Sequence, residues 1–324
     1  MTQTKKEEGV SSALHIMVAA DRNYLYPALV LLVSLLHNHR NDDLTIYFLQ
    51  SGLSIQDQQL LQKLEEKWKK TIYCIEVTED CRQGLKGFDR FSVAAFYRIL
   101  GMELVPHSVD RILYLDVDMV VNQNLLELFS MDLTNPLAAC YDINNELQGN
   151  IDYHKSVLGI SREQPYFNSG MLVMDMEYIR KHHVKEIVFK DILEHFEEYT
   201  LVDQDALNRY YVGKTLYLPW QKYNCPCVPL LSTDATGVFD QEKLLSYQEL
   251  RNWQEEDREG YDVTNQIIQE ASVIHFCTSQ KPWRDREFYR KENMTVARII
   301  YERYERLLQR VLPEVRQGYI DTLK

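Results

Sequence analysis

The sequence contains no apolar run long enough to cross a membrane. Its most apolar stretch, residues 24–36, is shorter than the roughly 20 residues that a bilayer-spanning helix needs. Residues 1–9 are polar and of mixed charge, so they lack the apolar segment of a secretory signal peptide. We therefore expect a soluble, cytoplasmic protein.

Cysteines are few, and none of them has the spacing of a zinc site. The six cysteines are Cys74, Cys81, Cys140, Cys225, Cys227 and Cys277. Only one residue separates Cys225 from Cys227, whereas zinc ribbons use two Cys-x-x-Cys pairs. Scattered cysteines of this kind are typical of reduced thiols in a cytosolic protein.

Basic residues are in the minority. Against 48 Asp and Glu there are 36 Lys and Arg, which gives a formal net charge of −12. A nucleic-acid-binding protein needs a basic surface to contact phosphates, so we expect no nucleic-acid partner. The exception is residues 284–324, where ten Lys and Arg against seven Asp and Glu give a local charge of +3.

Short apolar runs alternate with helical patterns along the chain. Strands are predicted at residues 14–20, 45–49, 72–77, 111–121, 137–140, 171–174 and 272–276, and helices from residue 24 and at 54–68, 93–104, 178–196 and 203–211. The 111–121 run is broken only by two aspartates. This alternation predicts an α/β fold with a doubly wound, mostly parallel, Rossmann-like sheet, whose ligands bind at the carboxyl ends of the strands.

We expect one catalytic domain at residues 1–283 and a small helical appendage at residues 284–324. An apolar stripe at i, i+4 spacing marks the helix of the appendage: Val296, Ile300, Tyr304 and Leu308. Because arginines surround this stripe, the helix can rest peripherally on an anionic membrane surface at the inner face of the cell membrane. Alternatively, the stripe packs on the rest of the chain. The sequence does not indicate an oligomeric state.

The centre of the sequence carries Asp116 and Asp118. On a strand, residues i and i+2 point to the same side, so the two carboxylates can converge at a strand end on one Mg²⁺ or Mn²⁺ ion. An isolated Asp-x-Asp triplet is common and is often only a solvated loop. Here the flanking residues are apolar, and buried carboxylates are costly unless they are paired or bind a metal.

Residues 114–121 resemble the Asp-x-Asp strand of glycosyltransferase family 8, which includes bacterial lipooligosaccharide α-galactosyltransferases and glycogenin. Further motifs follow in the family's order between residues 19 and 283: Ala19 to Tyr24, Arg98, Asp142, Phe167 to Gly170, Asp203 to Asp205, and His275 to Trp283. Each of them alone has an ordinary structural explanation. Their occurrence together in this order is specific. One departure is Thr278, where the family usually has a glycine that lets the backbone approach the phosphates.

The resemblance implies a GT-A type fold and a set of ligand-binding residues. It implies that Mn²⁺ or Mg²⁺ is held by Asp116, Asp118 and His275. It further implies that a UDP-sugar donor contacts Ala19, Ala20, Asp21, Asn23, Tyr24, Arg98, Asp116, Val117, Asp118, Asp142, Asn168, Ser169 and Lys281. Within that set, Asp21 and Asn23 hold the uridine, Asp142 binds sugar hydroxyls, and Lys281 binds the diphosphate.

The implied activity is retaining transfer of glucose or galactose from a UDP-hexose to a glycan, glycolipid or glycoprotein acceptor of the cell envelope. Gln204 and Asp203 occupy the catalytic face. A front-face reaction with Gln204 stabilising the sugar and a covalent intermediate on Asp203 are both compatible with the sequence. Two other classes remain as alternatives, a metal-dependent UDP-sugar hydrolase and a non-catalytic nucleotide-sugar binding module.

Overall fold

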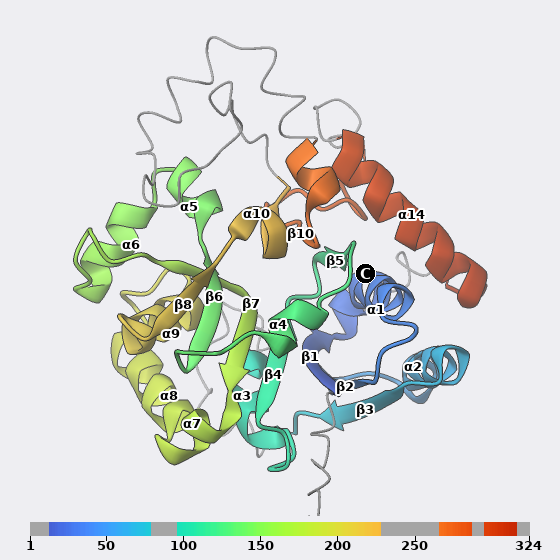
Figure 1. Cartoon of the computed structure of the whole chain (residues 1–324), viewed down its shortest axis with the longest axis horizontal. Helices are drawn as coiled ribbons and strands as arrows, with labels where there is room; N and C mark the ends of the chain where they lie inside the picture. The colour runs from blue at the N-terminus through green and yellow to red at the C-terminus, as the bar shows by residue number, and fades with distance from the viewer. Residues whose placement is uncertain (1–12, 79–95, 228–265, 287–294, 316–324) are drawn as a thin grey trace, which may run out of the picture.

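A mixed seven-stranded sheet forms the centre of the molecule. The computed structural model describes residues 13–78, 96–227, 266–286 and 295–315. The strand order is β3-β2-β1-β4-β7-β6-β8 (Figure 1). Their bounds are β1 Leu14–Asp21, β2 Leu44–Ser51, β3 Thr71–Glu76, β4 Arg111–Leu115, β6 Leu137–Tyr141, β7 Phe167–Asp175 and β8 Thr215–Leu218. All pairings are parallel except those of β7, which runs antiparallel to both β4 and β6.

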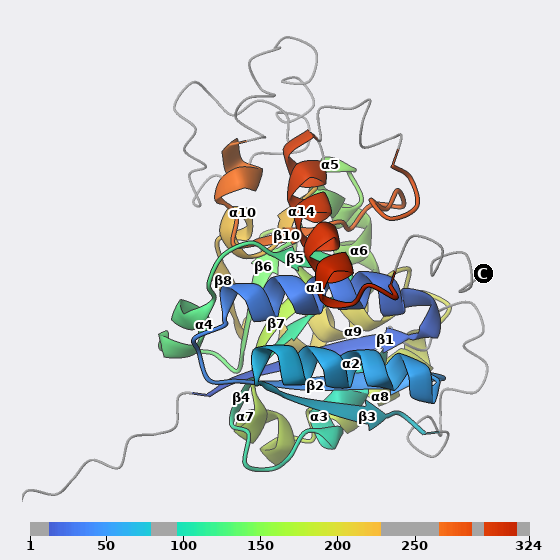
Figure 2. The same cartoon turned by 90° about the vertical axis from the view of Figure 1, so that its right-hand side faces the viewer.

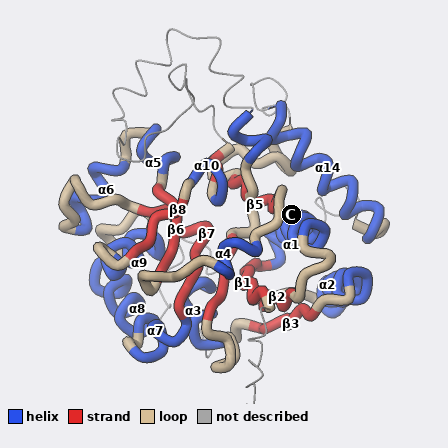
Figure 3. The backbone as a smooth tube through the Cα atoms, viewed as in Figure 1, coloured by secondary structure: helices blue, strands red, loops and turns tan. Residues whose placement is uncertain are grey.

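Helices cover both faces of the sheet, as a doubly wound fold requires (Figure 3). On β1, Ile16 and Val18 belong to one core, while Met17 and Ala19 belong to the other. The first core includes α1 Leu25–Asn38 and α2 Ile55–Trp68, and the second includes α3 Tyr97–Leu104, α7 Met176–Lys181, α8 Val184–His195 and α9 Val202–Tyr211. Shorter helices are η1 Arg22–Tyr24, α4 Leu126–Ser130, α5 Ile143–Leu147, α6 Ile151–Leu158 and α10 Trp220–Tyr223.

A small second sheet corrects one predicted element. It pairs β5 Met119–Val121 and β9 Cys225–Pro226 with β10 Val273–His275. The 111–121 run is therefore not one strand, because the chain leaves the large sheet after Leu115 and enters the small one at Met119. Between them, the Asp116 amide donates to the Gly170 carbonyl, and the Asp118 carbonyl accepts from the Phe276 amide. These bonds hold the two aspartates in a turn between the sheets.

The predicted helix at residues 178–196 is also divided in two. It forms α7 and α8, which are separated at His182 and His183. His183 has a φ of 50°, a left-handed conformation that interrupts the α-helical hydrogen bonds. The two helices therefore have different neighbours: α7 contacts β4 and β7, whereas α8 contacts α3 and α9.

Helix α1 explains the most apolar stretch of the sequence. Every residue from Leu25 to Leu36 is buried. The sheet and α2 lie on one side of α1, while β5 and the C-terminal helix α14 Thr295–Val311 lie on others (Figure 2). A helix that is apolar all round is one that the protein surrounds completely. Within the described residues, no helix has the length and apolarity needed to cross a membrane.

The apolar stripe of α14 packs on the rest of the chain. Ile300, Tyr304 and Leu308 are buried in the same core as α1. Beside them Glu305, only 4% exposed, accepts hydrogen bonds from the Tyr26 hydroxyl at 2.6 Å and from Arg286 at 2.7 Å. Burial and the Glu305 charge raise the pKa of Tyr26 above its usual value, so the phenol remains a donor. The packing alternative for the stripe is thus the one observed.

We expect Glu305→Ala to destabilise the protein substantially. The substitution leaves the buried Tyr26 hydroxyl and the Arg286 guanidinium without their acceptor, which should lower the free energy of unfolding by about 2–4 kcal/mol. Glu302→Ala on the same helix removes a more exposed pair with Arg298 and should cost less than about 1 kcal/mol. Urea denaturation of the two variants measures the difference. Equal effects would contradict the role of Glu305 in docking α14.

Candidate active site

One edge of the large sheet brings together most of the predicted site residues. Strands β1, β4 and β6 point their carboxyl ends to this edge. Because β7 runs the opposite way, its first residues, Asn168, Ser169 and Gly170, reach the same edge. Helix α9 begins there too, with Asp203 and Gln204 in its first turn. This is the edge at which α/β sheets bind their ligands.

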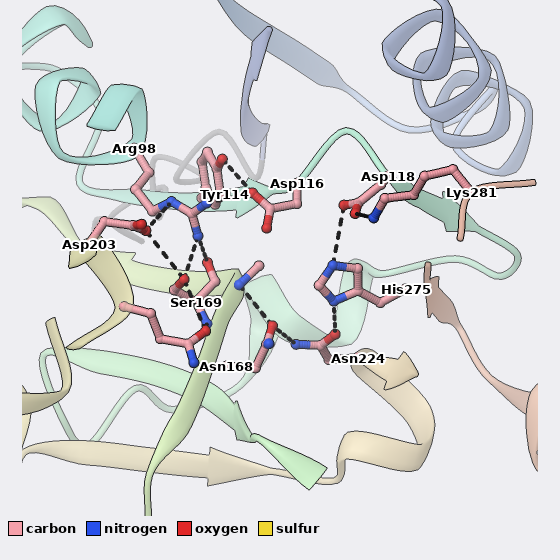
Figure 4. A network of polar contacts seen from close by, with 12 residues as sticks. Arg98, Tyr114, Asp116, Asp118, Asn168, Ser169, Asp203, Asn224, His275 and Lys281 are labelled. Carbon is pink, nitrogen blue, oxygen red and sulfur yellow. Dashed lines mark hydrogen bonds and ion pairs between the residues drawn. The ribbon is translucent and has the colours of Figure 1, made fainter. Parts of the chain in front are cut away.

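Asp116, Asp118 and His275 form a cluster that can hold a metal ion. One ligand atom from each of them lies within 4.8 Å of the others. The aspartates come from the turn between the two sheets, and His275 ends β10 (Figure 4). Two carboxylates and an imidazole suit a divalent ion such as Mn²⁺.

Gly170 makes room for this cluster. A Cβ atom at this position would lie 2.6 Å from Cε1 of His275 and 2.9 Å from Oδ2 of Asp116. Both distances are shorter than real Cβ contacts. Only glycine therefore lets the imidazole and the carboxylate approach each other across β7. The residues present fit a metal site.

Arg98 on α3 holds one half of the site together. It is buried, and its guanidinium donates to Asp116 Oδ1 at 2.9 Å and pairs with Asp203 Oδ2 at 3.0 Å. It also donates to the carbonyl and hydroxyl of Ser169, both at 2.6 Å. The Tyr114 hydroxyl donates to Asp116 Oδ1 at 2.7 Å, and the Tyr114 ring lies under the guanidinium. Arg98 thus joins β4, β7 and α9 (Figure 4).

Two carboxylates compete for this single guanidinium. Burial raises the pKa of Asp203 to about 6; Arg98 opposes the shift, and the Asp116 charge adds to it. Burial alone would lower the pKa of Arg98, but Asp116 and Asp203 raise it above its usual value. Arg98 therefore stays charged at every physiological pH.

Lys281 neutralises the other half of the site. Its ammonium donates to Asp118 Oδ2 at 2.7 Å and to the Phe276 carbonyl at 2.6 Å. Nε2 of His275 lies 3.2 Å from Asp118 Oδ1. Burial alone would raise the pKa of Asp118, but His275 and Lys281 together hold it well below its usual range. Asp118 is therefore a carboxylate and not a neutral acid.

Gln204 connects Ser169 of β7 to Asp142. Its Oε1 accepts from the Ser169 amide at 2.9 Å, and its Nε2 donates to Asp142 Oδ2 at 2.7 Å. Because a backbone N–H can only donate, the orientation of the Gln204 amide is set. Asp142 follows β6 and caps α5, where it also accepts from the Asn145 backbone amide at 3.2 Å. Nε2 further donates to the Tyr166 hydroxyl at 3.3 Å.

The predicted uridine-binding residues lie at the end of β1. Ala19 and Ala20 are buried within the strand, and Asp21 caps η1 by accepting from the Tyr24 amide at 3.1 Å. Asn23 is exposed on η1. The Arg284 guanidinium lies 5.7 Å from the centre of the Tyr24 ring, as in a cation–π contact. β1 is paired with β4, so these residues share the edge with Asp116.

Val117 is the last residue of the predicted donor-binding set, and Thr278 is the departure from the family pattern. Val117, between the two aspartates, is half-buried and packs against the core that contains α1. Thr278 stands where the resemblance leads us to expect glycine, and its hydroxyl donates to the Gln280 carbonyl at 2.9 Å. That bond holds the turn before Lys281.

Sequence reasoning missed three residues of the site. Tyr114 lies two positions before Asp116 on the strand, so the i, i+2 rule could have placed their side chains together. Tyr166 directly precedes the predicted 167–170 motif, and nothing in the sequence marks it as a partner of Gln204. Asn224 is 4% exposed and bonds both Asn168 and His275, although it belongs to none of the predicted motifs.

Comparison with known proteins places the chain in a family. The model of the family described as Glycosyl transferase family 8 matches residues 15–287. General stress protein A of Bacillus subtilis (strain 168) is 26% identical over 278 residues, which cover 83% of this chain and 87% of that protein. Lipopolysaccharide 1,2-glucosyltransferase of Escherichia coli (strain K12) is 24% identical over 282 residues, covering 86% and 75%.

A solved structure has the same fold. The galactosyltransferase LgtC, crystallised with donor and acceptor sugar analogs, superposes with a TM-score of 0.68 at 22% identity. The superposition covers 92% of this chain and 96% of LgtC. The predicted GT-A type fold is thereby confirmed.

The chain belongs to glycosyl transferase family 8, because the family model spans most of its length. It is therefore a glycosyltransferase with a candidate metal site at Asp116, Asp118 and His275.

We expect Gly170→Ala to weaken metal binding by about tenfold or more, because the added methyl group pushes two ligands apart. Titration with Mn²⁺, followed by electron paramagnetic resonance, measures the affinity. Gly213→Ala is a matched control, since its φ of 68° makes any side chain strained while no atom lies within 4 Å of the new Cβ. This control should lose stability but keep its affinity. Unchanged affinity in Gly170→Ala would show that these residues do not hold the ion.

Proposed function

We propose that the protein transfers glucose or galactose from a UDP-hexose to a carbohydrate-bearing acceptor with retention of the anomeric configuration. The observation that carries this proposal is the convergence of Asp116, Asp118 and His275 at the ligand-binding edge. Arg98 and Lys281 flank them, so the edge is suited to a diphosphate bound through a divalent cation.

The names of the relatives support a cell-envelope acceptor. One is a lipopolysaccharide 1,2-glucosyltransferase of Escherichia coli, and another is a lipopolysaccharide 1,3-galactosyltransferase of Salmonella typhimurium, 20% identical over 274 residues. We therefore propose a glycan, glycolipid or glycoprotein of the envelope as acceptor and a cytoplasmic site of action. The two relatives differ in the hexose they transfer, so both donors enter the assay described below.

The charges of the site suit a UDP leaving group. When bound, Mn²⁺ or Mg²⁺ supplies a Lewis acid that neutralises negative charge on the diphosphate. Asp116, Asp118 and His275 would hold the ion, and Lys281 would donate to phosphate oxygens. Asp21, Asn23 and the neighbouring end of β1 would bind the uridine.

The hydrogen bonds of the catalytic face favour the front-face reaction. Asp203 pairs with Arg98 at 3.0 Å, so its Oδ2 is already engaged by the guanidinium. Gln204 bridges Ser169 and Asp142, which would bind the sugar hydroxyls. We therefore assign Gln204 to stabilising the positive charge that develops on the sugar. In this assignment the acceptor attacks from the side of the leaving group.

Metal dependence of the transfer reaction directly tests the proposed metal site. Asp118→Ala, Asp116→Ala and His275→Ala should each reduce transfer at least about 100-fold, because each removes a ligand of the ion. Excess EDTA should abolish UDP release from UDP-glucose and UDP-galactose, and added Mn²⁺ should restore it. Circular dichroism controls for folding. Full activity in EDTA would rule out the metal assignment.

The same assay separates the alternative functions. Release of UDP that acceptors do not stimulate would indicate a hydrolase. Binding of UDP-hexose without any turnover would indicate a binding module.

The stereochemical prediction follows from the roles of Gln204 and Asp203. NMR of the product made from an α-linked UDP-hexose should show an α-linkage. Gln204→Ala should lower kcat by about 10–100-fold with a KM change below about threefold, because its role lies in the transition state. A β-linked product would overturn the proposed retention, and a glycosyl adduct on Asp203 detected by mass spectrometry would favour the covalent route.

A peripheral membrane contact would involve the outer face of α14. Its apolar stripe is covered by α1, so the contact would be electrostatic, through the exposed Arg303, Arg306 and Arg310. Replacing the three arginines by glutamate should abolish co-sedimentation with vesicles of anionic phospholipid at low salt.

The matched control reverses three exposed lysines on the opposite side of the sheet, Lys181, Lys190 and Lys214. It should keep vesicle binding, because its net charge changes equally while α14 is untouched. Equal loss in both variants would mean that only net charge matters, and no binding by the wild type would exclude the contact.

A further inference from the structure

Tyr301 of α14 packs against both ends of the segment that carries Lys281. Its side chain is buried, and its ring meets two further aromatic rings. The centre of the Phe276 ring lies 5.3 Å away in an edge-to-face arrangement, and the centre of the Trp283 ring lies 6.0 Å away in a stacked one. Both separations are in the range that aromatic pairs prefer. One ring of α14 therefore supports residues 276 and 283 together.

The same two aromatic residues hold the ammonium group of Lys281. Its Nζ donates to the Phe276 carbonyl at 2.6 Å and lies 5.9 Å from the centre of the Trp283 ring, within reach of a cation–π contact. Asp118 Oδ2 accepts a further hydrogen bond from Nζ at 2.7 Å (Figure 4). The place of Lys281 at the site therefore depends on the places of Phe276 and Trp283.

The ends of this segment are fixed to the turn between the sheets and to α14. The Phe276 amide donates to the Asp118 carbonyl at 2.9 Å. Arg286, which follows the segment, pairs with Glu305 at 2.7 Å, one turn of α14 after Tyr301. Phe276 and Trp283 are both buried in the core that includes α14. Helix α14 thus forms part of the support on which the segment rests.

We propose that Tyr301 is the positioning residue that holds the Lys281 ammonium at the ligand-binding edge of the sheet. The inference deepens the proposed function, because it rests on Lys281 binding the diphosphate of the donor. Replacing the ring by a smaller side chain leaves a cavity beside Phe276 and Trp283. The two residues then lose the surface that fixes them, and Lys281 loses its position with them.

The first measurement is hydrogen–deuterium exchange of peptides covering residues 276–286, followed by mass spectrometry on the full chain without metal or nucleotide. Tyr301→Leu should speed this exchange at least about fivefold, because the segment opens more often. Tyr301→Phe keeps the ring and should exchange like the wild type. If Tyr301→Leu fails to fold, Tyr301→Met fills more of the space without restoring a ring. Unchanged exchange in the folded variant that lacks the ring would overturn the proposal.

The matched control is Tyr304→Leu on the same helix. Tyr304 is as buried as Tyr301, but it lies against α1, where its hydroxyl accepts from Asn38 Nδ2 at 2.9 Å and its ring centre is 6.3 Å from that of His37. This control should lose stability while residues 276–286 keep their wild-type exchange. Equal acceleration in Tyr301→Leu and Tyr304→Leu would show a general loosening of α14 and overturn the proposal.

The second measurement is UDP affinity by titration calorimetry in saturating Mn²⁺. Lys281→Ala should weaken binding about 10–100-fold, because it removes a charge-assisted hydrogen bond, and Tyr301→Leu should weaken it about tenfold. If Tyr301 acts through Lys281, adding Tyr301→Leu to Lys281→Ala should change the affinity less than about twofold. Additive losses would overturn the proposal, and so would wild-type affinity in Tyr301→Leu beside a weakened Lys281→Ala.

The outcomes separate this inference from the proposed function. Faster exchange in Tyr301→Leu, with UDP affinity unchanged in Lys281→Ala, would support the role of Tyr301 in placing the segment and overturn the diphosphate role of Lys281. Faster exchange with no UDP binding even by the wild type would likewise support that placement and overturn the proposed donor.

Discussion

The site depends on the buried guanidinium of Arg98. Asp116, in the turn after β4, and Asp203 of α9 pair with it, and Ser169 of β7 accepts two further hydrogen bonds. Carboxylates removed from water are tolerated only where a partner of opposite charge is positioned for them. Burial raises the pKa of Asp203 to about 6 although Arg98 opposes the shift. The ligand-binding edge of the sheet therefore keeps several carboxylates that can attract a divalent ion. The hydrogen bonds to Arg98 already hold these side chains in place.

The antiparallel direction of β7 is a second constraint on the arrangement of the site. Its antiparallel course carries Asn168, Ser169 and Gly170 to the edge where the parallel strands end. Gly170 lets His275 and Asp116 come close, while the other two residues bond to Asn224 and Gln204. One reversed strand thus supplies both the space beside the candidate metal ligands and the hydrogen bonds that hold Gln204 and Asn224.

Much of this arrangement was predictable from local patterns. The alternation of strand and helix patterns predicted a sheet with helices on both faces. The two aspartates within an apolar run predicted a site at the edge where the parallel strands end. The motif order of family 8 led to His275 and Lys281, which lie far from Asp118 in sequence and contact it in the structure. The break between β4 and β5 escaped prediction, because both segments are equally apolar and only their partners differ.

The sequence by itself determined the local elements and the kind of chemistry. Ser54 and Asp57 cap α2 through bonds three residues apart, and such short-range interactions are readable along the chain. Only the tertiary structure decided which groups meet. The reversed β7, the burial of α14 on α1, and the bonds of Asn224 join segments separated by tens to hundreds of residues. Contacts of that range depend on the packing of the whole core, which no local pattern encodes.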